Sequence, residues 1–241
     1  MVRTILDPVR VIAESSMSYQ IRLDFPRPPA ELIARAARTH VGVAGVHAGP
    51  RQVAHPAIKP LLAEWRICGP AFTVRPEYTD DLLVGELAGK YAKPGDVIVV
   101  DAGGREDRAC WGMGMSMAAQ RAGCAAVVLD GRCMNGALLT RERIQLPIFA
   151  RGLVASANGA ERAGWLNGAI VCGGVIVHPG DIVLADCDGV VFLPQAAAEA
   201  ILRKSEKYAS GAARDNQADL PYWQRRESEE KLRALADVEW C

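Results

Sequence analysis

Two segments of this chain place a Pro-Gly-Asp turn directly before a run of β-branched residues. Residues 93–104 read KPGDVIVVDAGG, and residues 178–189 read HPGDIVLADCDG. Proline presets a turn, glycine tolerates a positive φ, and a run of valine and isoleucine forms a buried strand. The pair is too short for a solenoid repeat. The pair predicts a fold in which a Pro-Gly-Asp turn leads directly into a buried strand at two places.

Strand and helix patterns alternate between these two segments. Residues 107–122 are predicted to form a helix that ends at Gly123, a residue type that commonly terminates helices. Residues 124–129, CAAVVL, have the composition of a fully buried strand. A strand, a helix and a strand within about 30 residues indicate a right-handed crossover between parallel strands. The region therefore predicts an α/β fold.

The rest of the chain supplies further elements of the same kinds. Three more helices are predicted, over residues 26–39, 79–91 and 196–208. Further strands are predicted over residues 65–74, 147–150, 169–177 and 182–193. The glycine-rich stretch 41–52 is predicted to turn back toward a strand.

This order of elements predicts a single α/β domain over residues 26–208. An N-terminal extension, 1–25, precedes it, and a charged C-terminal tail, 209–241, follows it. The aromatic residues of the tail suit either packing on a neighbouring subunit or a frayed terminus.

Length and composition exclude several classes of protein. The 241 residues are half apolar, which suits one large domain with a sizeable core. The 28 basic residues equal the 28 acidic ones and form no cluster, so we expect no nucleic-acid partner. No apolar run approaches the roughly 18 residues of a membrane span, and charged residues interrupt the N-terminal segment. We therefore expect no membrane contact and no signal peptide, and predict a cytoplasmic location.

The cysteines and histidines show no pattern of a metal or nucleophile site. Seven scattered cysteines without a C-x-x-C pair are typical of reduced, mostly buried thiols. The four histidines have no metal-ligand spacing with them, so no zinc site is expected. The spacing also identifies no Ser-His-Asp or Cys-His grouping.

The stretch most typical of a ligand-binding site is 101–115, DAGGREDRACWGMGM. A strand ends there, glycines turn the chain, and a helix begins. Such places hold anions, because the first N–H groups of a helix have no partner within it. The glycines lack the G-x-G-x-x-G spacing, so a dinucleotide site is not expected.

Two other short polar stretches lie in or directly after predicted strands. Residues 186–189, DCDG, are similar to a calcium loop, but the glycine is misplaced and the bidentate glutamate is missing. A turn held by Asx hydrogen bonds is the preferred interpretation. Residues 130–135, DGRCMN, carry an acid, a base and an amide, and form either a site or only a turn.

An ordered series of motifs resembles the RraA-like family, which includes the 4-hydroxy-4-methyl-2-oxoglutarate / 4-carboxy-4-hydroxy-2-oxoadipate aldolases. Besides the two Pro-Gly-Asp segments, the motifs are CGPAFTV (68–74), WG (111–112), AAVVLDG (125–131), PIFARG (147–152) and CGGVIV (172–177). The resemblance covers residues 31–194. It implies a swivelling β/β/α domain assembled as trimers or hexamers, with active sites in clefts between subunits.

The catalytic pattern of these aldolases is not kept. In them a Gly-x-x-Leu loop holds the carboxylate of pyruvate, an acid follows the glycine, and a later Arg-Asp pair contacts substrate and divalent metal. Here Gly112 matches the glycine, Met113 replaces the acid and Met115 the leucine. Met134 and Asn135 replace the arginine and the metal-binding aspartate.

These replacements remove the groups that a hard cation and a second carboxylate need. Mg²⁺ or Mn²⁺, the metal that the resemblance implies, prefers charged oxygen ligands, whereas Asn135 offers a neutral carbonyl and methionine a soft thioether. We therefore predict no metal site and no efficient metal-dependent aldol cleavage. The glycines and the helix N-terminus still favour an anion. The predicted ligand-binding residues are Gly112, Met113, Gly114, Met115, Met134 and Asn135.

Three hypotheses for the function remain open. The preferred one is a metal-independent lyase, decarboxylase or isomerase of a small oxo- or hydroxy-acid, with Asp130, Arg132 and Asp107 as candidate catalytic residues. Asp101 is a further candidate acid or base, and the four methionines from 113 to 134 form either an apolar cleft or the core of a dead site. The alternatives are a regulatory protein of the RraA type, and an aldolase or oxaloacetate decarboxylase with substitute metal ligands.

Overall fold

The computed structural model describes residues 19–76, 83–137, 144–157, 163–216 and 226–235. Within these ranges, nine strands form one mixed sheet and two further strands form a separate hairpin. The order along the main path is β1-β7-β3-β4-β5-β6-β2, and the β10–β11 hairpin joins it through β3. This arrangement confirms the α/β fold expected from the sequence.

Four parallel strands form the centre of the sheet. They are β3 (Ile67–Pro76), β4 (Val97–Trp111), β5 (Ala126–Cys133) and β6 (Ile148–Ala150). Shorter strands border them, namely β1 (Tyr19–Ile21), β2 (Lys59–Pro60) and β7 (Gly164–Leu166). The predicted crossover between parallel strands is therefore present, because β4, the helix after it and β5 follow one another in the chain.

The unbroken apolar run of β4 follows from burial on both faces of the sheet. Ile98 and Val100 face a core cluster shared with α3 (Leu83–Tyr91) and α4 (Met113–Arg121). Val97 and Val99 face a second cluster, shared with the hairpin of β8 (Ile170–Cys172) and β9 (Val175–Val177). Each face therefore needs its own apolar residues, which explains why the run does not alternate with polar ones.

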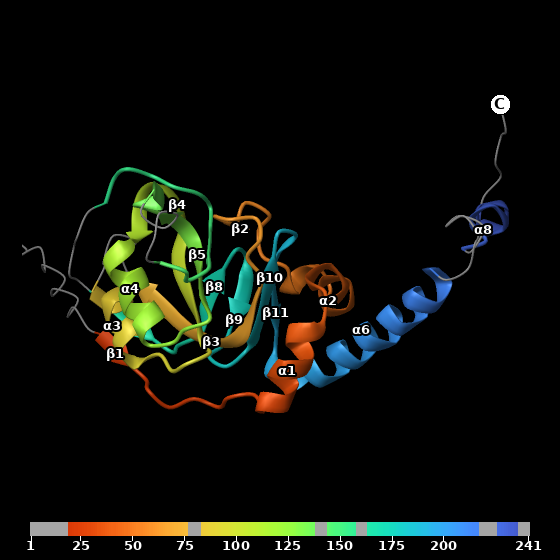
Figure 1. The fold of residues 1–241 in the computed structure, drawn as a ribbon, viewed down its shortest axis with the longest axis horizontal. Helices are drawn as coiled ribbons and strands as arrows, with labels where there is room; N and C mark the ends of the chain where they lie inside the picture. Colours follow the sequence, from red (N-terminus) through yellow and green to blue (C-terminus); the bar gives the residue numbers. More distant parts are fainter. Residues whose placement is uncertain (1–18, 77–82, 138–143, 158–162, 217–225, 236–241) are drawn as a thin grey trace, which may run out of the picture.

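A two-stranded hairpin and three helices lie beside the first half of β3 (Figure 1). The β10 strand (Ile182–Asp186) pairs with β11 (Gly189–Leu193) and with β3, and three helices cover this hairpin. The helices are α1 (Ala30–Arg38), α2 (Val41–Ala48) and α6 (Gln195–Asn216), with a 3-10 turn at Pro50–Gln52. Helix α6 extends away from the body toward α8 (Ser228–Leu235) (Figure 1).

The two Pro-Gly-Asp turns are built alike, as their sequences predict. Asp96 is fully buried and accepts the Lys93 N–H at 2.8 Å, and Asp181 accepts the His178 N–H at 2.8 Å. The preceding glycines, Gly95 and Gly180, both have a φ of +85°. Each aspartate therefore fixes a turn whose glycine occupies a conformation that other residues rarely adopt.

Several predicted boundaries were wrong. Residues 107–111 continue β4 instead of starting a helix, because Ala109 and Trp111 rejoin the ladder opposite β5 after register shifts that follow Val100. Residues 41–48 form α2 instead of a turn, because burial of Val41 and Ala44 against the β10–β11 hairpin outweighs the low helix propensity of glycine.

Other predicted boundaries also differ from those of the structure. The predicted strand 169–177 is a hairpin that turns at Gly173 and Gly174, both with positive φ, and the predicted strand 182–193 is likewise divided at its centre. The strand predicted over 124–129 reaches Cys133, and the helix predicted over 196–208 reaches Asn216. Residues 79–82 of a predicted helix and most of the N-terminal extension lie outside the described residues.

In the described part of the chain, no helix is long and apolar enough to cross a membrane. The six cysteines described there are free thiols, as predicted. Cys187 is exposed, whereas Cys110, Cys124, Cys133 and Cys172 are buried. Burial raises the pKa of the thiols of Cys110, Cys124 and Cys133 to about 12.

We predict that iodoacetamide at pH 8 modifies Cys187 rapidly and Cys110 and Cys133 only after unfolding. The thiolate is the reactive form, and a rise in pKa to about 12 lowers its population roughly thousandfold, in addition to blocking access. Peptide mass spectrometry after timed labelling measures each cysteine separately. Equal labelling rates for Cys187 and Cys110 in the native protein would contradict this packing.

The matched turns provide a test of close packing. An added Cβ at Gly180 would lie 2.1 Å from the Pro26 carbonyl oxygen, whereas one at Gly95 would meet nothing within 4 Å. Gly95→Ala should therefore lower the free energy of unfolding by about 1 kcal/mol through the positive φ alone. Gly180→Ala should cost at least about 2 kcal/mol more because of the clash. Urea unfolding measures both, and equal losses would show that the clash is relieved without cost.

Candidate ligand-binding cavity

A cavity of about 390 Å³ lies where β4 ends and α4 begins. Its walls come from α3, the last residues of β4, the first turns of α4 and the segment that follows β5. The lining includes all six predicted ligand-binding residues: Gly112, Met113, Gly114, Met115, Met134 and Asn135. The fold thus brings together two stretches that are far apart in the sequence.

Backbone contacts join these two stretches. The Met134 N–H donates to the Trp111 carbonyl oxygen at 3.0 Å, which continues the pairing of β4 and β5 to the edge of the cavity. A Cβ at Gly112 would lie 3.3 Å from the Met134 side chain, so glycine allows the two segments to approach closely. Asn135 then turns the chain with a φ of +66°, a conformation that asparagine tolerates better than most residues.

The amino end of α4 opens into the cavity. Its N-cap, Gly112, provides no side-chain acceptor, and the first intrahelical bond runs from the Ser116 N–H to the Gly112 carbonyl at 3.1 Å. The N–H groups of residues 113–115 therefore have no acceptor within the helix. A Cβ at Gly114 would meet nothing within 4 Å, so the space beside this first turn of the helix is open. Such a helix end favours an anion.

A hydrogen-bonded unit holds this helix end in place. The indole N–H of the buried Trp111 donates to Ser116 Oγ at 2.9 Å, and Ser116 Oγ donates to the Gly112 carbonyl oxygen at 2.9 Å. Trp111 thus forms a rigid wall of the cavity. Because both polar groups are satisfied, the wall presents an apolar surface to a ligand.

The methionines divide between the two roles that the sequence left open. Met115 is 7% exposed, belongs to the core cluster under α3 and α4, and also lines the cavity. Met113 and Met134 line it as well, while Met117 packs against the core cluster. The cavity therefore has flexible, apolar thioether walls.

The only charged side chain among the described lining residues is Glu86, which sequence analysis did not single out. It is an exposed residue of α3. Helix α3 approaches α4 closely at Gly89, where a Cβ would lie 2.7 Å from that of Ala118. No motif identifies Glu86, because its position depends on this contact between helices.

None of the three predicted catalytic residues lines the cavity. Asp130 is 5% exposed and accepts hydrogen bonds from Arg151 Nε at 2.7 Å and from the Gly173 N–H at 2.8 Å. It thereby connects β5 to β6 and to the turn of the β8–β9 hairpin. Asp101 is similar: it accepts from Arg75 at 2.8 Å and from the Val171 N–H at 3.1 Å. Both aspartates stabilise the hairpin on the opposite face of the sheet from α4.

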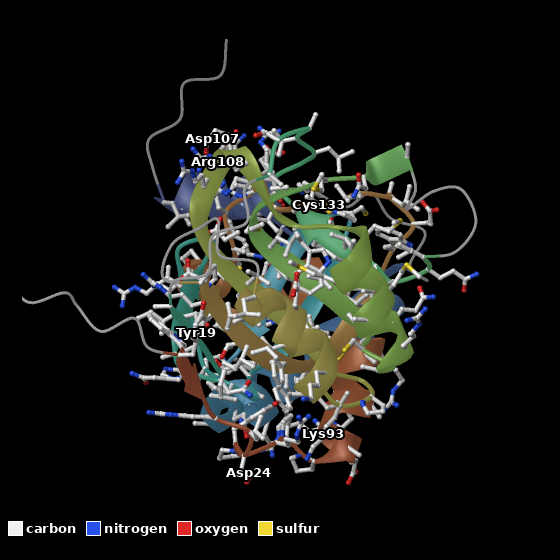
Figure 2. The ribbon with its side chains drawn as sticks, turned by 90° about the vertical axis from the view of Figure 1, so that its left-hand side faces the viewer. Tyr19, Asp24, Lys93, Asp107, Arg108 and Cys133 are labelled. Atoms are coloured by element: carbon white, nitrogen blue, oxygen red, sulfur yellow. The ribbon has the colours of Figure 1, made fainter. Side chains whose placement is uncertain are left out.

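Arg132 and Asp107 lie in the irregular part of the β4–β5 pairing, after the register shifts that follow Val100. Arg132 donates to Glu106 at 2.5 Å and to the Leu153 carbonyl oxygen at 3.2 Å, and the arginine lowers the pKa of Glu106. Asp107 is exposed and pairs with Arg105, which lowers the pKa of Asp107. Figure 2 shows Asp107 on the opposite side of the domain from Lys93, which precedes β4.

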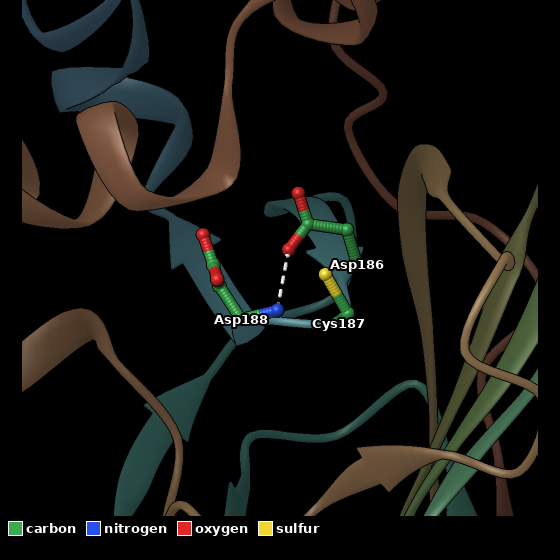
Figure 3. A group of neighbouring side chains, drawn as sticks. All are labelled: Asp186, Cys187 and Asp188. Carbon is green, nitrogen blue, oxygen red and sulfur yellow. Dashed lines mark hydrogen bonds between the residues drawn. The ribbon is translucent and has the colours of Figure 1, made fainter.

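The Asp186–Asp188 turn has the residue types of a cation site, and its three side chains bring their ligand atoms within 4.8 Å of one another (Figure 3). The Asp188 N–H donates to Asp186 Oδ1 at 2.8 Å, which confirms the predicted Asx turn. Lys59 Nζ donates to the carbonyl oxygens of Cys187 and Asp188 at 3.1 and 2.7 Å. An ammonium group therefore already supplies positive charge at this turn.

These contacts predict different effects of two aspartate substitutions. Asp130→Ala should lower the free energy of unfolding by about 3 kcal/mol, because it leaves the Arg151 guanidinium and the Gly173 N–H buried without their acceptor. Asp107→Ala, at an exposed ion pair, should change it by less than about 0.5 kcal/mol. Chemical denaturation measures both. A fully stable Asp130→Ala protein would show that the carboxylate has no structural role.

Comparisons with known proteins give the family. A protein from Halalkalibacterium halodurans, provisionally named 4-hydroxy-4-methyl-2-oxoglutarate aldolase, is 38% identical over 151 residues, which cover 62% of this chain and 70% of that protein. Streptomyces coelicolor RraAS2, described as an unusual member of the RNase ES inhibitor RraA protein family, has a structure with 27% identity and a TM-score of 0.71. That match covers 81% of this chain and 100% of the other.

A structure of an uncharacterized Pseudomonas syringae protein matches with a TM-score of 0.74 at 21% identity, over 85% of this chain and 97% of the other, and supports the fold. The family model described as Aldolase/RraA matches residues 39–192, which is more than half of the chain. The chain therefore belongs to the RraA-like family.

Proposed function

We propose that this protein binds the carboxylate of a small oxo- or hydroxy-acid at the amino end of α4. We propose further that it acts on this acid as an atypical lyase, decarboxylase or isomerase. The observation that carries the proposal is the open space beside Gly114, in the cavity lining and at a helix end without a side-chain cap. The Halalkalibacterium relative supports the substrate class, because the compound in its name is an oxo-acid.

The side chains of the cavity do not fit a resident divalent metal. Mg²⁺ and Mn²⁺ prefer several charged oxygen ligands, and the described lining offers one carboxylate, that of Glu86. Asn135 contributes a neutral amide, and Met113 and Met134 contribute soft thioethers. We therefore propose no step through a metal.

Without a metal, the backbone and the apolar walls of the cavity must bind and orient the ligand. The N–H groups of α4 orient the carboxylate, and the Trp111 and methionine walls exclude water from the rest of the ligand. The same helix N–H groups can stabilise negative charge that develops on the oxo group next to the bound carboxylate.

Access to the amino end of α4 can be blocked directly. We predict that Gly114→Leu weakens binding of 2-oxobutanoate at least about tenfold, because its side chain would fill the space over the N–H groups. The melting temperature should stay near that of the native protein, since the site is open. Isothermal titration calorimetry measures the affinity. Gly211→Leu, at an open position on α6, is the matched control, and unchanged binding in Gly114→Leu would place the carboxylate elsewhere.

The reaction class is tested by pyruvate release from oxaloacetate and from 4-hydroxy-4-methyl-2-oxoglutarate, with and without Mg²⁺. We predict no metal-dependent release by the native protein. The variant Met113→Asp, Met134→Arg, Asn135→Asp should gain it, because it restores the charged groups of the aldolase pattern. Chelator-sensitive turnover by the native protein would instead support an aldolase with substitute ligands.

A second candidate function is regulation through protein contacts. The similarity to RraAS2, which is described within a family of RNase ES inhibitors, favours it. Inhibition of an RNase E-type endonuclease by stoichiometric amounts of this protein would support a regulator. The same assay with Gly114→Leu separates the two functions, since a regulatory surface does not depend on the cavity.

We also propose a homo-oligomer, a trimer or a hexamer. Val46 is 78% exposed and Val53 is 40% exposed beside a second, apolar groove of about 380 Å³ between α2 and β11. Ile176 on the β8–β9 hairpin is 62% exposed. Burial of such side chains favours association. Light scattering coupled to size-exclusion chromatography measures the mass in solution.

A further inference from the structure

Two parts of the cavity lining differ in the charge that they favour. The amino end of α4 favours a negative group, while the carboxylate of Glu86 on α3 disfavours one. Among the described residues that line the cavity, none is a lysine or an arginine. A ligand with a single carboxylate can therefore satisfy α4 and keep its other end uncharged.

The rest of the lining fits an apolar substituent. Trp111 is almost fully buried with its N–H satisfied, and the thioethers of Met113, Met115 and Met134 form the neighbouring surface. Methionine side chains adapt to aliphatic chains of different shape. A second carboxylate in this surface would lose its water without gaining a cationic partner from the described lining residues.

We infer that the cavity selects 2-oxo-monocarboxylates with a short aliphatic side chain, and that Glu86 excludes dicarboxylates. This inference rests on the proposed function, because it takes the amino end of α4 as the site of the first carboxylate. It differs from what the name of the Halalkalibacterium relative states, since 4-hydroxy-4-methyl-2-oxoglutarate carries two carboxylates.

Glu86 acts in this account as a specificity residue. A like charge within several ångströms weakens ligand binding in a partly desolvated site, and removal of that charge relieves the repulsion. The effect depends on the second carboxylate alone. A monocarboxylate should therefore respond little to a change at residue 86, whereas a dicarboxylate should respond strongly.

The test uses two five-carbon ligands that differ at one end, 2-oxopentanoate with a methyl group and 2-oxoglutarate with a carboxylate. Calorimetric titration of the native protein should give at least about tenfold tighter binding of 2-oxopentanoate. Glu86→Gln should reduce this ratio, and Glu86→Lys should invert it, because the ammonium group pairs with the second carboxylate. Glu31→Lys, at an exposed residue of α1, controls for the change in net charge.

The outcomes separate this inference from the proposed function. Tighter or equal binding of 2-oxoglutarate by the native protein overturns the inference and leaves carboxylate binding at α4 intact. An unchanged ratio in Glu86→Lys, with a melting temperature equal to that of the native protein, overturns the role of Glu86. If neither ligand binds the native protein, both the proposed function and the inference fail.

Discussion

The pairing of β4 with β5 is the interaction on which the rest of the structure depends. Both strands are buried on two faces, so their aliphatic side chains stabilise α3 and α4 on one side and the β8–β9 hairpin on the other. The same pairing continues past the parallel core to Trp111 and Cys133. It therefore fixes the amino end of α4 and the segment at Met134 as two walls of one cavity.

The buried aspartates within these two strands serve the scaffold. Asp101 and Asp130 use their carboxylates to hold backbone N–H groups of the hairpin, on the face opposite the cavity. This division leaves the cavity with backbone donors and apolar walls. Under our proposal, the scaffold keeps a helix end suited to a carboxylate, while neutral and apolar side chains line the rest of the cavity.

Much of the scaffold can be predicted from local sequence. The Pro-Gly-Asp turns and the buried strands follow from short motifs, whereas the six cavity residues from Gly112 to Asn135 follow from the resemblance to the RraA-like aldolases. The extension of β4 through Trp111 could not be predicted, because polar residues interrupt the strand and only pairing with β5 restores it. Helix α2 and the placement of Glu86 likewise depend on contacts between distant segments, which local propensity does not contain.

The most direct test of the central claim is a crystal structure of the protein grown with 2-oxopentanoate and a chelator. The account predicts carboxylate oxygens within hydrogen-bond distance of the N–H groups of residues 113–115, with the aliphatic end of the ligand toward Glu86. A ligand bound elsewhere would contradict it. So would a structure grown with Mg²⁺ in which Asn135 and Glu86 hold the metal and the metal holds the ligand.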